Sequence, residues 1–255
     1  MLFRRKKSRT AGIALGSGGA KGFAHIGALQ AFREEGIEFG AAAGASAGAV
    51  VGALYAAGFA PPDILETYRS IDWGGTALAV LFSRSAAPLE KILDEALGGR
   101  DIGELGIPFA ATATNTADGS GVVLTEGRAS RAVFASCAVP PLFPPVEMNG
   151  MKLADGAYSD AVPADAARAL GADFVIGITL SPASSYAAKE FTTEAGRTLV
   201  TRQTGILACD ILLSPDLSEY AGTSVFRADE IYDIGYACAK NRMPEIRKKM
   251  KEAGL

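Results

Sequence analysis

Short apolar runs alternate with longer helix-like segments along the first part of the chain. Gly12–Leu15 and Glu38–Ala43 are predicted to be buried strands, and Ala20–Glu35 between them has the length and composition of a helix. Ala47–Ala57, which is rich in small residues and stops at Gly58, predicts a second helix. This order predicts a mostly parallel sheet with helices on both faces, in which ligands bind beyond the carboxyl ends of the strands.

Turn signals mark two hairpins in the middle of the chain. Asp118-Gly119-Ser120 separates the alternating runs Pro108–Thr114 and Gly121–Thr125, and Asn149-Gly150 divides Val146–Leu153 with a dipeptide favoured in tight hairpin turns. The remaining expected elements are helices at Pro61–Ser70, Pro88–Leu97, Ser130–Ala138, Ala164–Ala169, Lys189–Leu207 and Ala228–Glu252, and strands at Asp173–Thr179 and Asp210–Leu213.

The composition fits one folded α/β domain. The 255 residues are 49% hydrophobic and 21% charged, with only 12 prolines, which excludes a disordered or fibrous chain. No internal repeat or Ser/Gly-rich linker divides the sequence. We therefore expect a single domain over residues 11–255, preceded by a tail over residues 1–10.

Charge is distributed unevenly along the chain. The formal net charge is −3, yet the first ten positions hold five basic residues: Arg4, Arg5, Lys6, Lys7 and Arg9. The acidic body gives no electrostatic case for nucleic-acid binding, so no nucleic-acid partner is expected. A basic tail can approach an anionic lipid surface, although a solvated tail is the plainer interpretation, and peripheral membrane contact stays open.

Cysteine usage and the length of apolar runs bear on the compartment. Cys137, Cys209 and Cys238 are odd in number and lack CxxC spacing, which argues against a disulfide framework or a cysteine metal site. The apolar stretch Ala11–Leu15 after the basic tail is too short for an export signal. No run is long enough for a membrane-spanning helix, so a cytoplasmic location is expected.

One candidate nucleophile stands at a predicted strand-to-helix junction. Gly44-Ala45-Ser46-Ala47-Gly48 matches the pattern GxSxG. Glycines on both sides of Ser46 permit a sharp, strained turn that presents the hydroxyl above the sheet, at the amino end of a helix. The alternative interpretation is a tightly packed helix entry without chemistry.

A second glycine-rich loop, Gly16–Gly22, follows the first predicted strand. Its glycines allow backbone N–H groups to converge on one small volume, as an oxyanion or a phosphate requires. The loop fails both the Walker A spacing and GxGxxG, so nucleotide binding is the weaker interpretation, beside a tight turn that binds nothing. Lys21 lies in the first helical turn, where a carbonyl or carboxylate partner is expected for its charge.

An activated serine needs a base, and the only histidine, His25, is unsuited to the usual triad. His25 precedes Ser46 in the chain, whereas α/β-hydrolases place histidine last, so a packing role near the site is favoured. Asp155 ends an apolar run beside Gly156 and is the preferred base. Asp118, in a polar turn, is its competitor.

Gly16–Gly22, Gly44–Gly48 and Asp155-Gly156-Ala157, in this order, resemble the patatin-like phospholipase family, particularly its small bacterial members. The resemblance covers nearly the whole chain and includes the proline block Ser136–Pro145 and the segment Asp160–Ala169. It implies a three-layer α/β/α sandwich, a serine–aspartate dyad and a glycine-loop oxyanion hole, without metal or other cofactor.

The resemblance assigns roles residue by residue. Ser46 matches the nucleophile, Asp155 the dyad aspartate, and Gly18 and Gly19 the oxyanion-hole glycines. The supporting motif positions are Gly16, Lys21, Gly22, Gly44, Gly48 and Gly156. The chain departs from the family pattern at Ser17, which replaces a glycine, at Lys21, which replaces an arginine, and at Ala157, which replaces a glycine.

The expected function is therefore a serine acyl hydrolase acting on carboxylic esters of lipids. The irregular segment Ile71–Ala87, which contains Trp73, Leu78 and Phe82, is either a lid or acyl pocket, or part of the core. Two alternatives stay open: a catalytically silent regulator or scaffold on the same fold, and a phosphate or nucleotide binder through Gly16–Gly22. The sequence predicts neither the oligomeric state nor the lipid.

Overall fold

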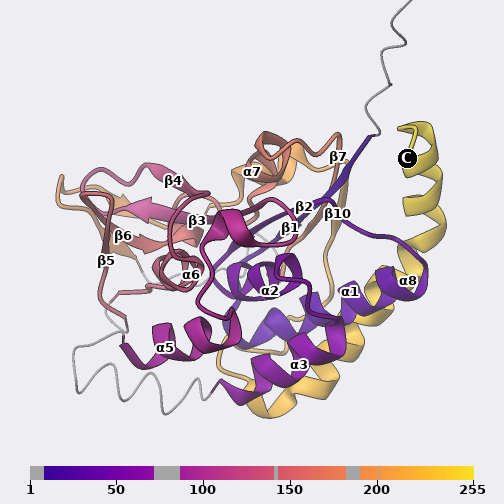
Figure 1. The fold of residues 1–255 in the computed structure, drawn as a ribbon, viewed down its shortest axis with the longest axis horizontal. Coiled ribbons are helices and arrows are strands. Elements are labelled where there is room, and N and C mark those ends of the chain that lie inside the picture. Colours follow the sequence, from indigo (N-terminus) through magenta and orange to yellow (C-terminus); the bar gives the residue numbers. More distant parts are fainter. Residues whose placement is uncertain (1–8, 72–86, 141–142, 182–189, 201) are drawn as a thin grey trace, which may run out of the picture.

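A computed structural model describes residues 9–71, 87–140, 143–181, 190–200 and 202–255, with the side chains of 87–89 left out (Figure 1). Its centre is an eight-stranded sheet in which the path of neighbouring strands is β10-β7-β1-β2-β3-β6-β5, while β4 also pairs with β3. The parallel part consists of β1 (Ala11–Leu15), β2 (Ala41–Ala45), β3 (Phe109–Asn115), β7 (Phe174–Ile178) and β10 (Ile211–Leu213). The predicted mostly parallel sheet is confirmed.

Antiparallel strands complete one side of the sheet. These are β4 (Gly121–Leu124), β5 (Val146–Met148) and β6 (Met151–Asp155). The hairpin of β3 and β4 and that of β5 and β6 both occur where the turn signals predict them. Asn149 and Gly150 have φ of 53° and 75°, as a tight hairpin turn with two left-handed residues requires.

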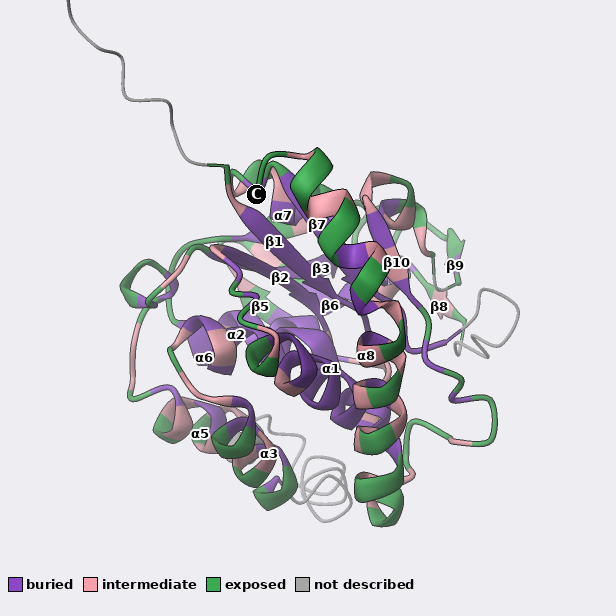
Figure 2. Cartoon of the chain, turned by 90° about the vertical axis from the view of Figure 1, so that its right-hand side faces the viewer, coloured by how far each residue is buried: buried purple, intermediate pink, exposed green. Residues whose placement is uncertain are grey.

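Helices cover both faces of the sheet because successive strand residues point to opposite sides. Ile13 and Leu15 of β1 belong to the larger core, and Ala14 belongs to a smaller one on the opposite face. The helices of the larger core are α1 (Phe23–Glu34), α2 (Ala47–Ala56), α3 (Pro61–Ser70), α5 (Ala87–Ala96), α6 (Ala129–Ser136) and α8 (Ala228–Glu252). The smaller core lies under α7 (Ala164–Ala169), and the central strands are buried throughout (Figure 2).

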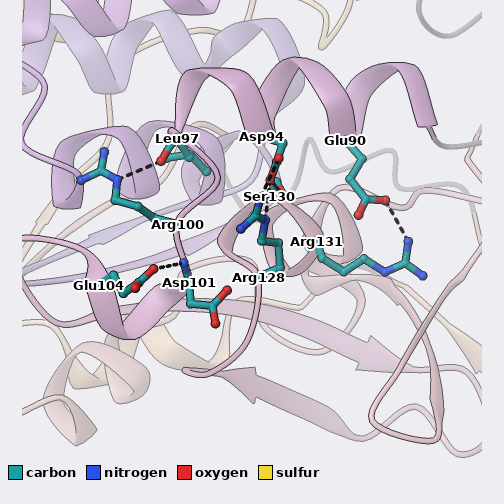
Figure 3. Close-up of polar contacts among 9 residues, drawn as sticks. All are labelled: Glu90, Asp94, Leu97, Arg100, Asp101, Glu104, Arg128, Ser130 and Arg131. Atoms are coloured by element: carbon teal, nitrogen blue, oxygen red, sulfur yellow. Dashed lines mark hydrogen bonds and ion pairs between the residues drawn. The ribbon is translucent and has the colours of Figure 1, made fainter.

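Helix α5 is fastened to α6 by polar contacts (Figure 3). The Arg128 guanidinium bonds Asp94 at 2.7 Å, and the Ser130 hydroxyl donates to the same carboxylate at 2.7 Å. Arg131 bonds Glu90 at 2.8 Å. Helix α6 is therefore anchored on its outer side, away from the sheet.

The prediction of a helix over Lys189–Leu207 is wrong. Residues 182–189 lie outside the described part, and the next elements are a short hairpin of β8 (Phe191–Thr192) and β9 (Thr198–Leu199), then the 3-10 helix Thr204–Ala208. Gly196 has a φ of 76°, which lets the chain reverse between the two strands. The β-branched threonines beside this turn favour strand over helix.

The boundaries of two early elements also differ from the prediction. The expected helix Ala20–Glu35 divides into the 3-10 helix Gly19–Gly22 and α1, and the second strand begins at Ala41 rather than Glu38. The N–H of Phe39 donates to the Tyr55 hydroxyl at 3.1 Å, and backbone bonding to β1 begins only at Gly40, whose N–H donates to the Ala11 carbonyl oxygen at 2.8 Å.

Parts of the sequence predictions fall outside the described residues. Residues 1–8 of the basic tail and 72–86 of the irregular segment are among these. The single-domain organisation over residues 11–255 stays a prediction. In the described part of the chain, no helix combines the length and the apolar character needed to cross a membrane.

Candidate active site

Ser46 occupies a strained turn between β2 and α2. Its φ and ψ are 53° and −121°, a conformation that costs a residue with a side chain about 1–3 kcal/mol. The Ser46 carbonyl oxygen accepts from the N–H groups of Ala49 and Val50 and so starts α2. The Ser46 N–H donates to the Ser136 hydroxyl oxygen at 2.8 Å. The GxSxG pattern thus forms the predicted strand–turn–helix junction.

The two glycines of the pattern are required by close backbone approaches. A Cβ on Gly44 would lie 2.3 Å from the Gly48 carbonyl oxygen, and a Cβ on Gly48 would lie 2.0 Å from that of Leu15. Both separations are far below a normal contact. The turn that exposes Ser46 therefore packs directly on the end of β1, beside the glycine loop.

The sheet brings Asp155 to Ser46 through an unusual junction on β3. Strand β4 pairs with Ala111–Thr114 of β3, while β2 pairs up to Thr112 and β6 pairs from Ala113 onward. Because a strand has only two edges and β4 overlaps both partners, β2 and β6 share the other edge. They run in opposite directions, so their carboxyl ends meet there, with Ser46 and Asp155 at the meeting point.

Asp155 is buried beside the nucleophile candidate. The residue is 2% exposed, and Oδ1 accepts from the N–H of Ala157 at 2.8 Å. Burial raises the pKa of Asp155 to about 6, although the bond from Ala157 and the nearby Ser46 hydroxyl lower it. Among the described residues, the buried Oδ2 has no partner at normal hydrogen-bond distance. The carboxylate therefore has an acceptor atom to offer in the site.

Two adjacent N–H groups of the glycine loop have no acceptor in the part of the chain that the structure describes. Backbone carbonyls accept the N–H groups of Gly16, Ser17, Ala20 and Lys21, at distances between 2.8 and 3.2 Å. No described residue accepts those of Gly18 and Gly19. The loop thus keeps donors at the two positions that the sequence resemblance assigns to an oxyanion hole.

The position of Gly19 is fixed from two sides. The hydroxyl of Tyr68, a buried residue of α3, donates to the Gly19 carbonyl oxygen at 2.8 Å, and the N–H of Ala20 donates to the Gly222 carbonyl oxygen at 2.8 Å. Gly19 has a φ of 58°, and a Cβ there would lie 2.4 Å from the Gly222 carbonyl oxygen. Only glycine fits this position without strain.

His25 supports the glycine loop, as its predicted packing role implies. It is fully buried in α1, and burial lowers the pKa of its imidazole to about 4, so the ring is neutral near pH 7. Because a neutral ring faces a carbonyl oxygen, Nε2 carries the proton and donates to Gly16 at 2.7 Å. Nδ1 is buried, and no residue in the described ranges bonds it.

The side chains of Lys21 and Asp118 bond residues other than Ser46. The Lys21 ammonium donates to the Ser181 hydroxyl at 3.4 Å, rather than to the expected carbonyl or carboxylate, and burial lowers its pKa. Asp118 is exposed in the turn after β3, where its carboxylate accepts from the N–H and hydroxyl of Ser120. Asp155, and not Asp118, is the carboxylate brought to Ser46.

Sequence reasoning gave no individual role to the first residues of the proline block, Ser136, Cys137 and Ala138. Ser136 accepts the Ser46 N–H, and Cys137 has its thiol beside both Ser46 and Asp155. The carbonyl oxygen of Ala138 accepts the N–H of Asp155 at 2.8 Å. The available signal was a polar pair, serine and cysteine, inside an otherwise apolar helix end.

Within the described ranges, no group of three or more metal-ligating side chains is placed to hold an ion.

Comparisons with solved structures bear on the fold. VipD from Legionella pneumophila superposes with a TM-score of 0.54 and 16% identity, covering 94% of this chain and 72% of that one. The type III effector protein ExoU gives a TM-score of 0.53 and 14% identity, covering 93% of this chain and 53% of that one. The arrangement of sheet and helices described above therefore occurs in both of these proteins.

Sequence comparisons identify the family. An uncharacterized NTE family protein of Mycobacterium tuberculosis is 37% identical over 73% of this chain and 53% of its own length. Lysophospholipase NTE1 of Saccharomyces cerevisiae is 27% identical over 74% of this chain and 12% of its own length. The chain thus spans about half of the mycobacterial relative and a small part of the yeast one. The family model "Patatin-like phospholipase" matches residues 13–168, a range that contains the glycine loop, Ser46 and Asp155. The chain belongs to the patatin-like phospholipase family.

Proposed function

We propose that this chain is a serine acyl hydrolase that cleaves carboxylic esters of lipids, with Ser46 as the nucleophile and Asp155 as the base. One observation carries the proposal: a buried aspartate, with an oxygen that no described residue bonds, lies beside a serine on a strained turn. Strain of this kind concentrates where a side chain must be presented to a substrate. Membership of the patatin-like phospholipase family supports the same reaction class.

In the proposed mechanism, Ser46 Oγ attacks the acyl carbonyl carbon while its proton passes to the Asp155 carboxylate. The N–H groups of Gly18 and Gly19 donate to the oxyanion of the tetrahedral intermediate. Collapse breaks the ester bond, and the leaving alcohol takes the proton from Asp155. Water then attacks the acyl-enzyme, gives its proton to Asp155, and releases the fatty acid as Ser46 regains its hydrogen.

The electrostatics of Asp155 suit this role. A pKa of about 6 leaves the carboxylate ionised at neutral pH, yet makes it a stronger base than an exposed aspartate. His25 is neutral but bonded to Gly16 through Nε2, so it supports the loop rather than Ser46. The dyad therefore operates without an imidazole.

Lysophospholipids are the first substrates to test, because a relative carries the name lysophospholipase. The experiment measures hydrolysis of p-nitrophenyl esters of graded chain length, a diacyl phospholipid and a lysophospholipid. Ser46→Ala and Asp155→Asn should fall to near background, whereas Asp118→Asn, which changes an exposed turn carboxylate, should retain wild-type rates. Labelling of wild type by a fluorophosphonate, absent in Ser46→Ala, identifies the nucleophile.

The same experiment separates the alternatives. A folded wild-type protein that neither hydrolyses any ester nor takes up the fluorophosphonate would contradict the proposal and favour a silent regulator or scaffold. Thermal stabilisation by ATP or inorganic phosphate, in the absence of hydrolysis, would favour a phosphate or nucleotide binder at Gly16–Gly22. Hydrolysis that survives in Asp155→Asn would assign the base to another group.

A further inference from the structure

Three consecutive residues at the end of α6 contact both proposed catalytic residues. The Ser136 hydroxyl oxygen accepts the Ser46 N–H at 2.8 Å, and the Ala138 carbonyl oxygen accepts the Asp155 N–H at 2.8 Å. Between them, the Cys137 thiol lies beside the side chains of both Ser46 and Asp155. One tripeptide therefore bonds the backbone of both residues and fills the space next to them.

The sheet alone does not set the separation of Ser46 and Asp155. Strands β2 and β6 are each paired to β3, and the path of neighbouring strands in the described sheet joins them only through it. The carboxyl ends of β2 and β6 meet along the same edge of β3, where the backbone pairing of β3 passes from β2 to β6. Ser46 also has a left-handed φ of 53°, which the chain leaves readily if its backbone bonds are lost.

Water has little access to replace these bonds. Ser136 is 0% exposed and Cys137 is 6% exposed, so solvent does not reach the Ser136 hydroxyl that accepts from Ser46. Toward its start, α6 is held in place by the bond of Arg131 to Glu90 of α5 (Figure 3). The tripeptide thus extends from a rigid element rather than from a loose loop.

We propose that Ser136-Cys137-Ala138 is a clamp that positions the Ser46–Asp155 pair, and that Ser136 is a positioning residue for the nucleophile. Ser136 touches neither substrate nor reacting atoms in this scheme. It holds the Ser46 backbone in the conformation that directs Oγ toward the substrate and toward Asp155. The inference rests on the proposed function, because the clamp is defined by the pair it positions.

The test compares two buried serines of the same helix. Ser136→Ala removes the acceptor of the Ser46 N–H, whereas Ser130→Ala removes a hydroxyl that bonds Asp94 and lies away from the pair. We expect Ser136→Ala to lower kcat about 10- to 100-fold with KM changed less than about threefold, since small displacements of a reacting group have effects of this size. Ser130→Ala should keep kcat, and Ser136→Thr, which retains a hydroxyl, should recover most of it.

Hydrogen exchange gives a readout that does not depend on catalysis. The Ser46 amide should exchange at least tenfold faster in Ser136→Ala than in wild type, with no such change in Ser130→Ala. Unchanged kcat together with unchanged Ser46 exchange in folded Ser136→Ala would overturn the clamp. Equal losses of kcat in Ser136→Ala and Ser130→Ala would also overturn it, as a general effect of weakening α6. If wild type lacks ester hydrolysis, the proposed function fails, while the exchange rates still decide whether Ser136 holds Ser46.

Discussion

Nε2 of His25 donates to the carbonyl oxygen of Gly16 at 2.7 Å and thereby ties α1 to the first turn of the glycine loop. The single histidine of this chain therefore acts on the loop that carries Gly18 and Gly19, and not on the serine.

Replacing His25 should separate support from catalysis. His25→Phe leaves the Gly16 carbonyl oxygen without this donor, at a cost of about 1–3 kcal/mol in the free energy of unfolding, and should lower kcat by displacing the loop. The acid limb of the pH–rate profile should keep its position, because His25 is not the base. A shift of that limb, or loss of activity as complete as in Ser46→Ala without loss of stability, would make His25 catalytic.

The pH dependence of stability should also change in His25→Phe. The folded pKa of His25, about 4, lies below its ordinary value of 6.5. Its contribution to stability is therefore present above pH 6.5 and is lost as the pH falls toward 4. Urea unfolding at pH 7 and pH 4.5 should show a smaller acid loss in His25→Phe than in wild type, and an equal loss in both would contradict the buried neutral ring.

Activity should rise with pH through the pKa of Asp155. The base must be ionised to accept the proton of Ser46, so kcat/KM should increase with an inflection near pH 6 and then level off. The measurement is a pH–rate profile on a short-chain ester from pH 4.5 to 8.5. An inflection at the ordinary aspartate value of 3.8 would mean that Asp155 is not the titrating base.

Asp155→Asn should stabilise the protein at neutral pH. Because the folded pKa is raised above 3.8, the contribution of Asp155 to stability is full below about pH 4 and is lost as the pH rises through 6. The variant should therefore be more stable than wild type by up to about 3 kcal/mol at pH 8, with little difference at pH 4. Denaturant unfolding at both pH values checks this, and a variant less stable at pH 8 would show that the charge is well compensated.

The strain at Ser46 predicts opposite effects on stability and activity. Ser46→Gly should raise the melting temperature, because glycine adopts a φ of 53° without penalty, and Ser46→Ala should leave it nearly unchanged. Both variants should hydrolyse esters at background rates. The double variant Ser46→Ala/Asp155→Asn should be no slower than either single variant, since members of one catalytic unit act non-additively. If the activity losses of the two single variants multiply in the double variant, Asp155 is a structural residue.

A matched pair of glycines tests the oxyanion loop. Gly19→Ala places a Cβ 2.4 Å from the Gly222 carbonyl oxygen, whereas Gly36→Ala has a similar φ of 68° and meets nothing within 4 Å among the described residues. Both substitutions cost backbone strain, but only Gly19→Ala should lower kcat, by about 100-fold or more if one oxyanion donor is lost. Equal kcat in the two folded variants would argue against an oxyanion role for Gly19.

Local features of the site could be predicted from the sequence because they depend on neighbouring residues. Glycines on either side of Ser46 mark a turn that other residues cannot make, and Asn149-Gly150 selects its hairpin for the same reason. The glycine loop after the first strand and Asp155 at the end of an apolar run are likewise visible in a few consecutive letters. The error over Lys189–Leu207 arose where helix length and composition outweighed the turn signal of Gly196.

Only the tertiary structure decided which of these groups meet. Asp155 rather than Asp118 reaches Ser46 because β2 and β6 share one edge of β3, which the order of strands along the chain does not reveal. The bond from the Ser46 N–H to the Ser136 hydroxyl spans 90 residues. His25 of α1 bonds the Gly16 carbonyl oxygen rather than the serine. Short-range sequence patterns specify backbone conformation, whereas the pairing of distant polar groups depends on how buried strands and helices pack together, because each buried donor must find an acceptor there.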